Sequence, residues 1–337
     1  MEKFIHGNTD EFIQWHDTDG NIINASDGGI IFAEGKYHWY GQALRPCPNT
    51  PDGTAATTVT GVVMYESEDL LNWKYEGVIL ECSSDPESEL YAPMRFERPK
   101  IIYNEKTKQY VLWCHYVRHP GCHGSEPGQA EAGVAFCDSV NGKYKWLGTS
   151  RPVDGKFVQD CALFKDDDGS AYFIYDRNLS NTSFIKGVDD RCLHVVKLSD
   201  DYLSFTNTYK RIDACYWREA PAIFKKDGYY YMITSGVTGW FTNQAEAFRS
   251  RDIMGEWESI GDPCIGDDTH TTFNTQTTYA FKVHNSDTVI VMLERHNLSN
   301  FLECSYVWLP VEFNDNNTVS LTYKKEWTLK DFNQRLK

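Results

Sequence analysis

The stretch Glu219-Ala-Pro-Ala-Ile-Phe224-Lys-Lys-Asp-Gly228-Tyr-Tyr-Tyr-Met232 runs from a polar residue through an apolar pair and a tight turn to an aromatic strand. Asp-Gly between two apolar runs is a strong signal for a β-hairpin. The same order of features occurs in five copies, which begin at Asp27, Glu97, Asp160, Glu219 and Gln276. Repeats of this length that begin alike predict a β-propeller, with one copy opening each blade.

A second recurring unit follows each copy and consists of a strand, a Ser/Asp turn and an aromatic closing strand, as in Tyr65–Trp73. The two units together predict an all-β, five-bladed β-propeller. The predicted four-stranded blades span roughly residues 22–83, 91–149, 155–213, 216–264 and 269–330. Because no Gly-, Ser- or Pro-rich linker divides the chain, we expect residues 1–337 to form a single domain. The N-terminal segment 1–21 would then pack on the propeller or close it.

Charge and cysteine content exclude several classes of function. The net charge of −15 argues against binding to nucleic acid or to an anionic membrane surface. No apolar run is long enough for a transmembrane helix, and a secretory signal is either absent or removed, so we expect a cytoplasmic protein. The ten cysteines include no CxxC pair, which predicts buried free thiols and no zinc site. Nothing in the sequence indicates an oligomeric state.

The five polar starts carry the functional signal. Because the first strand of each propeller blade lines the central channel, we expect these side chains to ring one mouth of it. Convergent carboxylates are the equipment of inverting glycoside hydrolysis, which needs one protonated and one ionised carboxyl about 6.5–9.5 Å apart. A third acid nearby keeps the proton donor protonated. A polar residue before a strand can also be a simple turn former, as is natural for Asp27 beside Gly28-Gly29.

Three of these starts resemble motifs of glycoside hydrolase family 43, whose members are five-bladed propellers. Asp27-Gly-Gly-Ile-Ile31 is similar to the motif that bears the general base, and Glu219-Ala-Pro221 to the Glu-Gly-Pro motif of the general acid. Asp160-Cys-Ala-Leu-Phe164 is similar to the motif of the aspartate that tunes the pKa of the acid. The resemblance implies that Glu219, Asp27 and Asp160 are catalytic.

Longer strings resemble the exo-β-1,3-galactanase branch of that family. These strings are Phe96-Glu-Arg-Pro-Lys100, Arg218-Glu-Ala-Pro221, Thr234-Ser-Gly-Val-Thr-Gly-Trp240 and Phe273-Asn-Thr-Gln276. In that branch glycines replace the aspartate base, and a glutamine like Gln276 is implicated in its role. Asp27 departs from this pattern, which leaves the base open between Asp27 and Gln276. It also leaves α-L-arabinofuranosidase, β-galactofuranosidase and β-xylosidase activity open, beside exo-action on plant-type β-1,3-galactan.

Other residues are candidates for holding the oligosaccharide or polysaccharide-derived substrate: Glu97, Gln276, His115, Trp240, Arg98 and Trp217. His115 could equally be a core histidine, and Trp240 could be a loop packing residue. Arg98 and Arg218 flank the two glutamates and could set their ionisation. No cofactor is expected, although His270 weakly resembles a family position near a central metal, so a structural calcium there stays possible. The alternative of another class is a non-catalytic sugar-binding propeller.

Overall fold

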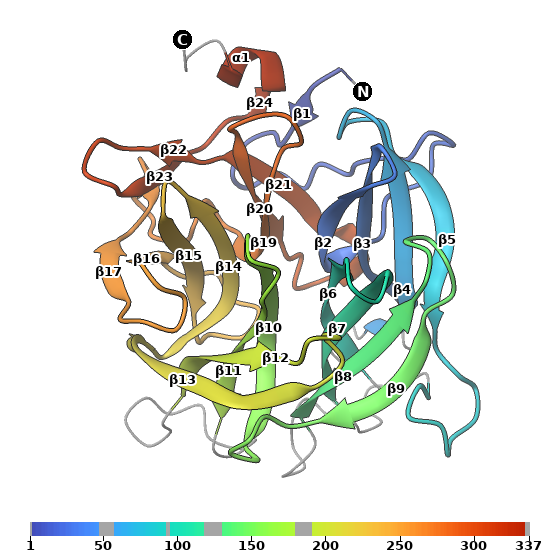
Figure 1. Ribbon diagram of the computed structural model, residues 1–337. Helices are drawn as coiled ribbons and strands as arrows, with labels where there is room; N and C mark the ends of the chain where they lie inside the picture. The colour runs from blue at the N-terminus through green and yellow to red at the C-terminus, as the bar shows by residue number, and fades with distance from the viewer. Residues whose placement is uncertain (1, 47–56, 92–94, 118–129, 179–190, 334–337) are drawn as a thin grey trace.

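The computed structural model describes residues 2–46, 57–91, 95–117, 130–178 and 191–333. Within these ranges the chain forms strands β1 to β24, the short helix η1 (Phe301–Glu303) and the terminal helix α1 (Leu329–Asn333). The sheets are arranged around a central axis, as Figure 1 shows. The predicted all-β propeller is therefore confirmed. No helix of the described residues is long and apolar enough to cross a membrane.

Four sheets are antiparallel meanders of four strands each. The first two are β2 (Ser26–Ala33), β3 (Lys36–Pro46), β4 (Thr57–Ser67) and β5 (Lys74–Glu81), then β6 (Arg95–Asn104), β7 (Gln109–Val117), β8 (Ala130–Cys137) and β9 (Lys145–Ser150). The next two are β10 (Phe157–Lys165), β11 (Ala171–Asn178), β12 (Cys192–Leu198) and β13 (Phe205–Tyr216), then β14 (Arg218–Lys226), β15 (Tyr229–Gly236), β16 (Glu246–Ser250) and β17 (Glu258–Gly261). The hairpin signals are borne out: Asp227 and Gly228, between β14 and β15, both have positive φ, as a two-residue hairpin turn requires.

The prediction of five blades is wrong, because the described residues form six sheets of three or more strands. The last predicted blade, residues 269–330, divides in two. Its first part is β19 (Gln276–Lys282), β20 (Val289–Arg295) and β21 (Ser305–Pro310). Its second part, β22 (Glu312–Phe313) and β23 (Val319–Thr322), joins β18 (Cys264–Ile265), which pairs parallel with β23.

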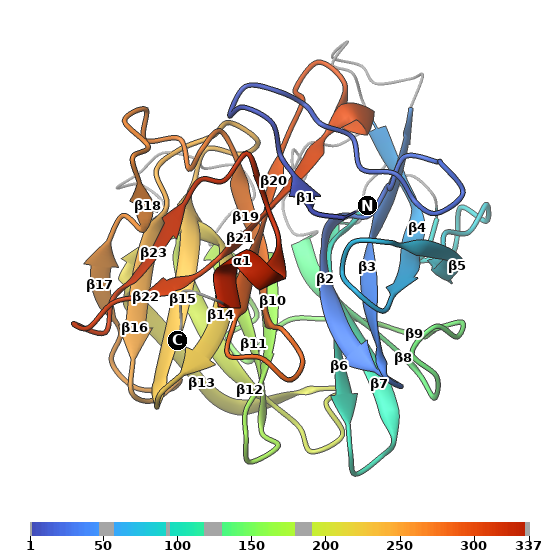
Figure 2. The same ribbon diagram turned by 90° about the horizontal axis from the view of Figure 1, so that it is seen from above.

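The division falls after Pro310, the last residue of β21. Pro310 has no N–H to donate, and beyond it the Val311 N–H still donates to the Val289 carbonyl of β20 at 2.9 Å. β23 then packs against the preceding sheet, where Val319 and Leu321 share an apolar cluster with Phe224 and Ile233. Figure 2 shows β22 and β23 beside β15 and β16. The sequence pattern of the last repeat could not reveal that its closing strands pair with a strand from the repeat before it.

The two ends of the chain meet on the last sheet. β1 (Phe4–Ile5) pairs with β24 (Glu326–Trp327), and the Phe4 and Trp327 rings stack with centroids 4.6 Å apart. Trp15 and Trp308 continue this buried aromatic cluster, which also contains Trp39 of β3. The cluster therefore joins the first sheet to the last and closes the ring. Each fully buried aromatic side chain of this kind contributes roughly 1.5–3 kcal/mol through its apolar area.

Each innermost strand contains a β-bulge near its start, and the bulges set the geometry of the channel mouth. In β6, Glu97 pairs with His115 and Lys100 with Trp113, so Arg98 and Pro99 face one residue of β7. Shifts at the same place occur in β2, β10, β14 and β19. A bulge re-aims side chains and suits proline, whose missing N–H needs no ladder partner there.

The bulge in β2 explains the glycine that follows Asp27. Asp27 has φ of 54°, as do the equivalent bulge residues Arg98 (51°) and Ala220 (54°). A Cβ on Gly28 would lie 1.6 Å from the carbonyl oxygen of Tyr40, so no other residue fits. In pairing register, Ser26 rather than Asp27 is the counterpart of Glu97 and Glu219. The five predicted starts are therefore not one structural position.

Candidate active site

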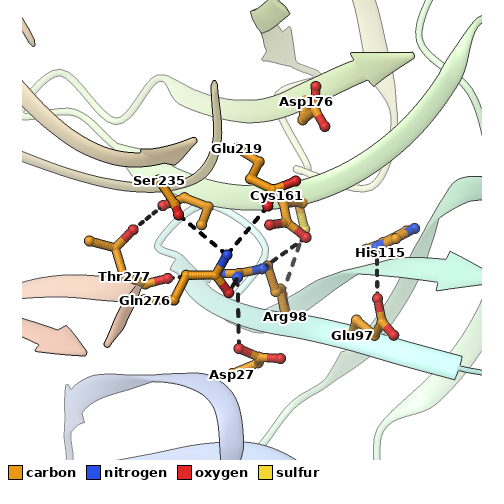
Figure 3. A network of polar contacts seen from close by, with 12 residues as sticks. Asp27, Glu97, Arg98, His115, Cys161, Asp176, Glu219, Ser235, Gln276 and Thr277 are labelled. Carbon is orange, nitrogen blue, oxygen red and sulfur yellow. Dashed lines mark hydrogen bonds and ion pairs between the residues drawn. The ribbon is translucent and has the colours of Figure 1, made fainter. Parts of the chain in front are cut away.

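The starts of β2, β6, β10, β14 and β19 bring most of the predicted site residues together at one end of the channel (Figure 3). Arg98 joins them. Its Nε lies 3.0 Å from Asp160, and its two terminal nitrogens donate to Gln276 Oε1 and to the Thr277 carbonyl, both at 2.9 Å. Arg98 is fully buried, and its charge balances part of the acidic cluster. Its predicted place beside the acids is what the structure shows.

Glu219 lies at the start of β14 and is 6% exposed. One carboxyl oxygen accepts from Arg191 at 3.0 Å, and the other lies 3.4 Å from the Gln276 amide nitrogen. Burial, and after it the negative charge of Asp160, raise the pKa of Glu219 to about 8 against the opposing effect of Arg191. Glu219 is therefore protonated at neutral pH, as a proton donor must be.

Asp176 and Arg191 complete the surroundings of Glu219, and both were missed in the sequence. Arg191 donates to Asp176 through Nε at 2.8 Å and bridges it to Glu219. Burial raises the pKa of Asp176 to about 6, although the adjacent Arg191 opposes the shift. Asp176 directly follows the apolar run Tyr172–Tyr175, and a carboxylate at the end of a buried strand is the signal that could have found it.

Asp27 is buried more deeply than the predicted acids Glu97, Asp160 and Glu219 and is only 1% exposed. Its Oδ2 accepts from Gln42 at 3.0 Å, and its backbone N–H donates to Glu294 at 2.9 Å. Lys100, also buried, donates to the carbonyls of Asp27 and Gly28. Asp27 Oδ1 is 3.9 Å from Arg98, beyond hydrogen-bonding distance. Side chains of Asp160 and Glu97, at 17% and 12% exposure, are more accessible.

Glu97 faces His115 across the β6–β7 ladder, with Oε2 and Nδ1 3.3 Å apart. The two side chains point toward one another beside the Arg98 cluster (Figure 3). His115 thus contacts Glu97, a predicted site residue, and is also buried. It therefore has features both of a substrate-binding residue and of a core histidine. A carboxylate and an imidazole at this distance can accept and donate hydrogen bonds to sugar hydroxyls.

The predicted aromatic platforms lie at different distances from this cluster. The Trp240 ring packs edge-on against His296, with centroids 4.9 Å apart, and against Phe301. The carbonyl of the preceding residue, Gly239, accepts from Gln276 at 3.4 Å, which places Trp240 beside the site. Trp217 is half-buried, and its backbone N–H donates to the Arg191 carbonyl. Among the described residues, no hydrogen bond or ring contact joins the Trp217 ring to the acids.

Two expectations about charged residues are corrected or displaced. Arg218 turns away from Glu219 and donates to Thr234 and to the Gln244 carbonyl, so it does not set the ionisation of Glu219 by direct contact. His270 is exposed and contacts Asp262 at 3.5 Å. Among the described residues, the side chains close enough to share an ion are instead Asp27, Glu294 and His296. The sequence also predicts long loops at residues 44–58 and 117–130, a type of segment that often carries specificity, and most of these residues lie outside the described ranges.

A second set of polar residues lies on the strands that pair with the innermost strands, and most of this set was not predicted from the sequence. Ser26, Glu97, Glu219 and Gln276 pair in register with polar residues at the ends of β3, β7, β15 and β20, namely Gln42, His115, Ser235 and Glu294. Only His115 of these was a candidate. Because antiparallel partners of first-strand starts are second-strand ends, a polar residue closing the second strand of each repeat was the available signal.

Comparisons with known proteins agree with this geometry. Residues 52–319 match the family described as Glycosyl hydrolases family 43. A family 43 β-1,3-galactosidase solved with galactodeoxynojirimycin is 33% identical, with a TM-score of 0.84 over 97% of this chain and 100% of that one. An exo-β-1,3-galactanase from Clostridium thermocellum is 31% identical, with a TM-score of 0.76 over 96% of this chain and 66% of that one.

A curated relative is also similar over part of the chain. It is a xylan 1,3-β-xylosidase from a Vibrio species, 26% identical over 216 residues. The matched part is 59% of this chain and 36% of that relative, so the match spans about a third of the curated protein's length.

Proposed function

The chain belongs to glycosyl hydrolases family 43, and from this we propose that it is an inverting, exo-acting glycoside hydrolase that removes terminal galactose from β-1,3-linked galactan. One observation carries the proposal most: Glu219 is a buried carboxyl with its pKa raised to about 8, placed beside the amide of Gln276. Similarity to a β-1,3-galactosidase and an exo-β-1,3-galactanase, both above 30% identity, supports the sugar and the linkage.

The proposed roles follow from charge and contact. Glu219 protonates the leaving oxygen, because its raised pKa keeps a proton on it at neutral pH. Asp160 forms an ion pair with Arg98, and its negative charge keeps that proton on Glu219 by repulsion. Glu97, His115, Arg98, Trp217 and Trp240 hold the substrate. We propose that residues 1–337 act together as one catalytic domain.

The general base is the role for which two residues compete. The position of Gln276 favours it as the base, since its side-chain amide lies between Glu219 and Arg98. Asp27 is the ordinary chemical choice, since a carboxylate accepts a proton from water and an amide does not do so readily. Its near-complete burial and its bulge position argue that water reaches it less easily. We therefore place Gln276 against the reacting water and keep Asp27 as the alternative base.

The second candidate substrate is a β-xyloside, which the similarity to a xylan 1,3-β-xylosidase favours. Galactose differs from xylose by its C6 hydroxymethyl group, so the two activities need differently shaped pockets. α-L-Arabinofuranosides and β-galactofuranosides remain alternative substrates and are tested together with β-galactosides and β-xylosides. A sugar-binding protein without catalysis would need neither the buried protonated Glu219 nor a separate ionised acid.

The experiment is a substrate panel with the product anomer followed by NMR. We expect release of galactose, one unit at a time, from the non-reducing end of β-1,3-galactotriose, with the α-anomer formed first. Little product should come from the β-xyloside, α-L-arabinofuranoside and β-galactofuranoside. First formation of the β-anomer would overturn the inverting mechanism, and faster release of xylose would replace the substrate. Binding of galactotriose without any hydrolysis would support the non-catalytic alternative.

A further inference from the structure

Asp27, Glu294 and His296 form a buried cluster beneath the site described above. One potential ligand atom from each side chain lies within 4.8 Å of the others. All three residues are at least nine-tenths buried, with exposures of 1%, 1% and 7%. The bulge turns Asp27 toward this point. Glu294 is the last residue but one of β20, and the two-residue period of extended backbone places His296 on the same side. Arg295, between them, donates away from the cluster to the Glu11 and Phe273 carbonyls.

Several atoms of this cluster have no partner, although buried polar atoms normally have one. Asp27 Oδ1 and both ring nitrogens of His296 make no hydrogen bond within the described residues. Arg98 lies 3.9 Å from Asp27 Oδ1, but its donors are directed at Asp160, Gln276 and the Thr277 carbonyl. An unsatisfied buried polar group costs roughly 1–3 kcal/mol, which makes a missing ligand the natural explanation.

The charge of the cluster points to the kind of ligand. Two carboxylates stand within reach of each other, and Arg98 is the only cationic group of the described residues within 4.0 Å of either. Glu294 accepts from Ser26 Oγ at 2.6 Å and from the Asp27 N–H at 2.9 Å, so its oxygens already point inward and are fixed. A cation would neutralise both carboxylates and satisfy the open imidazole nitrogen together.

From this geometry we propose that Asp27, Glu294 and His296 bind one divalent first-row transition ion of the Mn²⁺ or Zn²⁺ type. One imidazole nitrogen and two carboxylate oxygens suit these ions, whereas Ca²⁺ takes oxygen ligands alone. This site is separate from the calcium position considered near His270, which is exposed and lies against Asp262. The ion would also hold His296, and with it the Trp240 ring that packs against the imidazole.

The test is a binding measurement that does not depend on activity. The protein is stripped with a chelator, dialysed and titrated by calorimetry with Mn²⁺ and separately with Zn²⁺. We expect one ion per chain for at least one of the two metals. Mn²⁺ is included because it prefers oxygen and nitrogen to thiolate, so the free cysteines do not compete for it. Ca²⁺ at the same concentration should not displace the bound ion.

Variants locate the site. Glu294→Gln and His296→Gln should each weaken binding by more than roughly tenfold, the least that loss of a supporting group costs at metal sites. His270→Gln is the matched control and should bind as wild type does. Circular dichroism verifies that each variant is folded. Absence of saturable binding of either ion to the wild type overturns the proposal without any variant. Binding that survives both ligand substitutions also overturns it, since the ion then sits elsewhere on this acidic protein.

Discussion

The side-chain amide of Gln276 lies 3.4 Å from the carboxyl of Glu219, although the two residues are 57 positions apart and belong to different sheets. Arg98 accounts for the orientation, because its guanidinium donates to Gln276 Oε1 and thereby turns the amide nitrogen toward Glu219. An N–H that donates to Glu219 also competes with its proton for the same oxygen. The pair therefore forms a polar centre whose protonation depends on the charges around it.

Replacing Glu219 by Gln removes the proposed acid with little change of shape. We expect kcat on β-1,3-galactobiose to fall by about 10²–10⁴, the usual contribution of general acid catalysis. An aryl galactoside with a good leaving group needs less protonation and should lose much less. Rates on both substrates give the comparison. Equal losses on the two substrates would show that Glu219 does not protonate the leaving group.

Asp27→Ala and Gln276→Ala separate the two candidates for the base. Because Gln276 faces Glu219 and Asp27 is buried in the bulge, we expect Gln276→Ala to abolish turnover. Asp27→Ala should retain measurable activity and lose stability, since the buried Gln42 amide loses the carboxylate that accepts its hydrogen bond. Azide added to each inactive variant provides the check, because this anion attacks the anomeric carbon in place of water, needs no base, and gives a glycosyl azide as the leaving group departs. An inactive Asp27→Ala with an active Gln276→Ala reverses the assignment.

Local signals in the sequence predicted the inner hairpins well. Asp227-Gly228 joins β14 to β15 and Glu34-Gly35 joins β2 to β3, each with positive φ at both residues. These signals act within a few residues, so they survive whatever packs around them. The repeat pattern also predicts that Glu97, Arg98, Asp160, Glu219 and Gln276 lie at one end of the channel.

Features that depend on distant parts of the chain were not predictable in the same way. Asp27 occupies the bulge position itself, one place after the counterpart of Glu219, and the close approach of Gly28 to the Tyr40 backbone leaves no room for a side chain there. Arg191 has no local motif, and its function follows only from its contacts with Asp176 and Glu219. The division of the last blade depends on pairing between β18 and β23, which are separated by more than fifty residues.

The raised pKa of Glu219 predicts the alkaline limit of activity. Since the acid must be protonated, kcat/KM should fall as pH rises through about 8. Asp160, Asp176, Arg191 and Arg98 are the charged groups that act on it. Asp160→Asn removes a negative charge that repels the ionised form of Glu219. The alkaline limit of kcat/KM should therefore move to lower pH, whatever the maximal kcat/KM of the variant. A limit that stays in place would show that burial alone sets the pKa.

The same shift makes stability depend on pH. The folded-state pKa of Glu219, about 8, lies above its ordinary value of 4.5, so the folded protein binds this proton more tightly than the unfolded chain does. Its stabilising contribution is complete below pH 4.5 and is lost as pH rises to about 8. Thermal unfolding of wild type and Glu219→Gln at several pH values measures it. The wild type should lose stability relative to the variant between these limits, and parallel curves would contradict the shift.

Arg98 is the residue whose loss should cost the most stability in the site. Arg98→Met keeps the apolar stem but leaves Asp160 without its ion pair and the Gln276 and Thr277 oxygens without donors. Breaking a buried pair in this way costs roughly 3–5 kcal/mol. Urea unfolding measures the loss, with Lys106→Met as the matched control, because Lys106 and Asp200 form an exposed pair that should contribute nothing measurable. Arg98→Met with wild-type stability would mean that water or protonation of Asp160 compensates for the missing charge, and the alkaline limit of activity should then also shift.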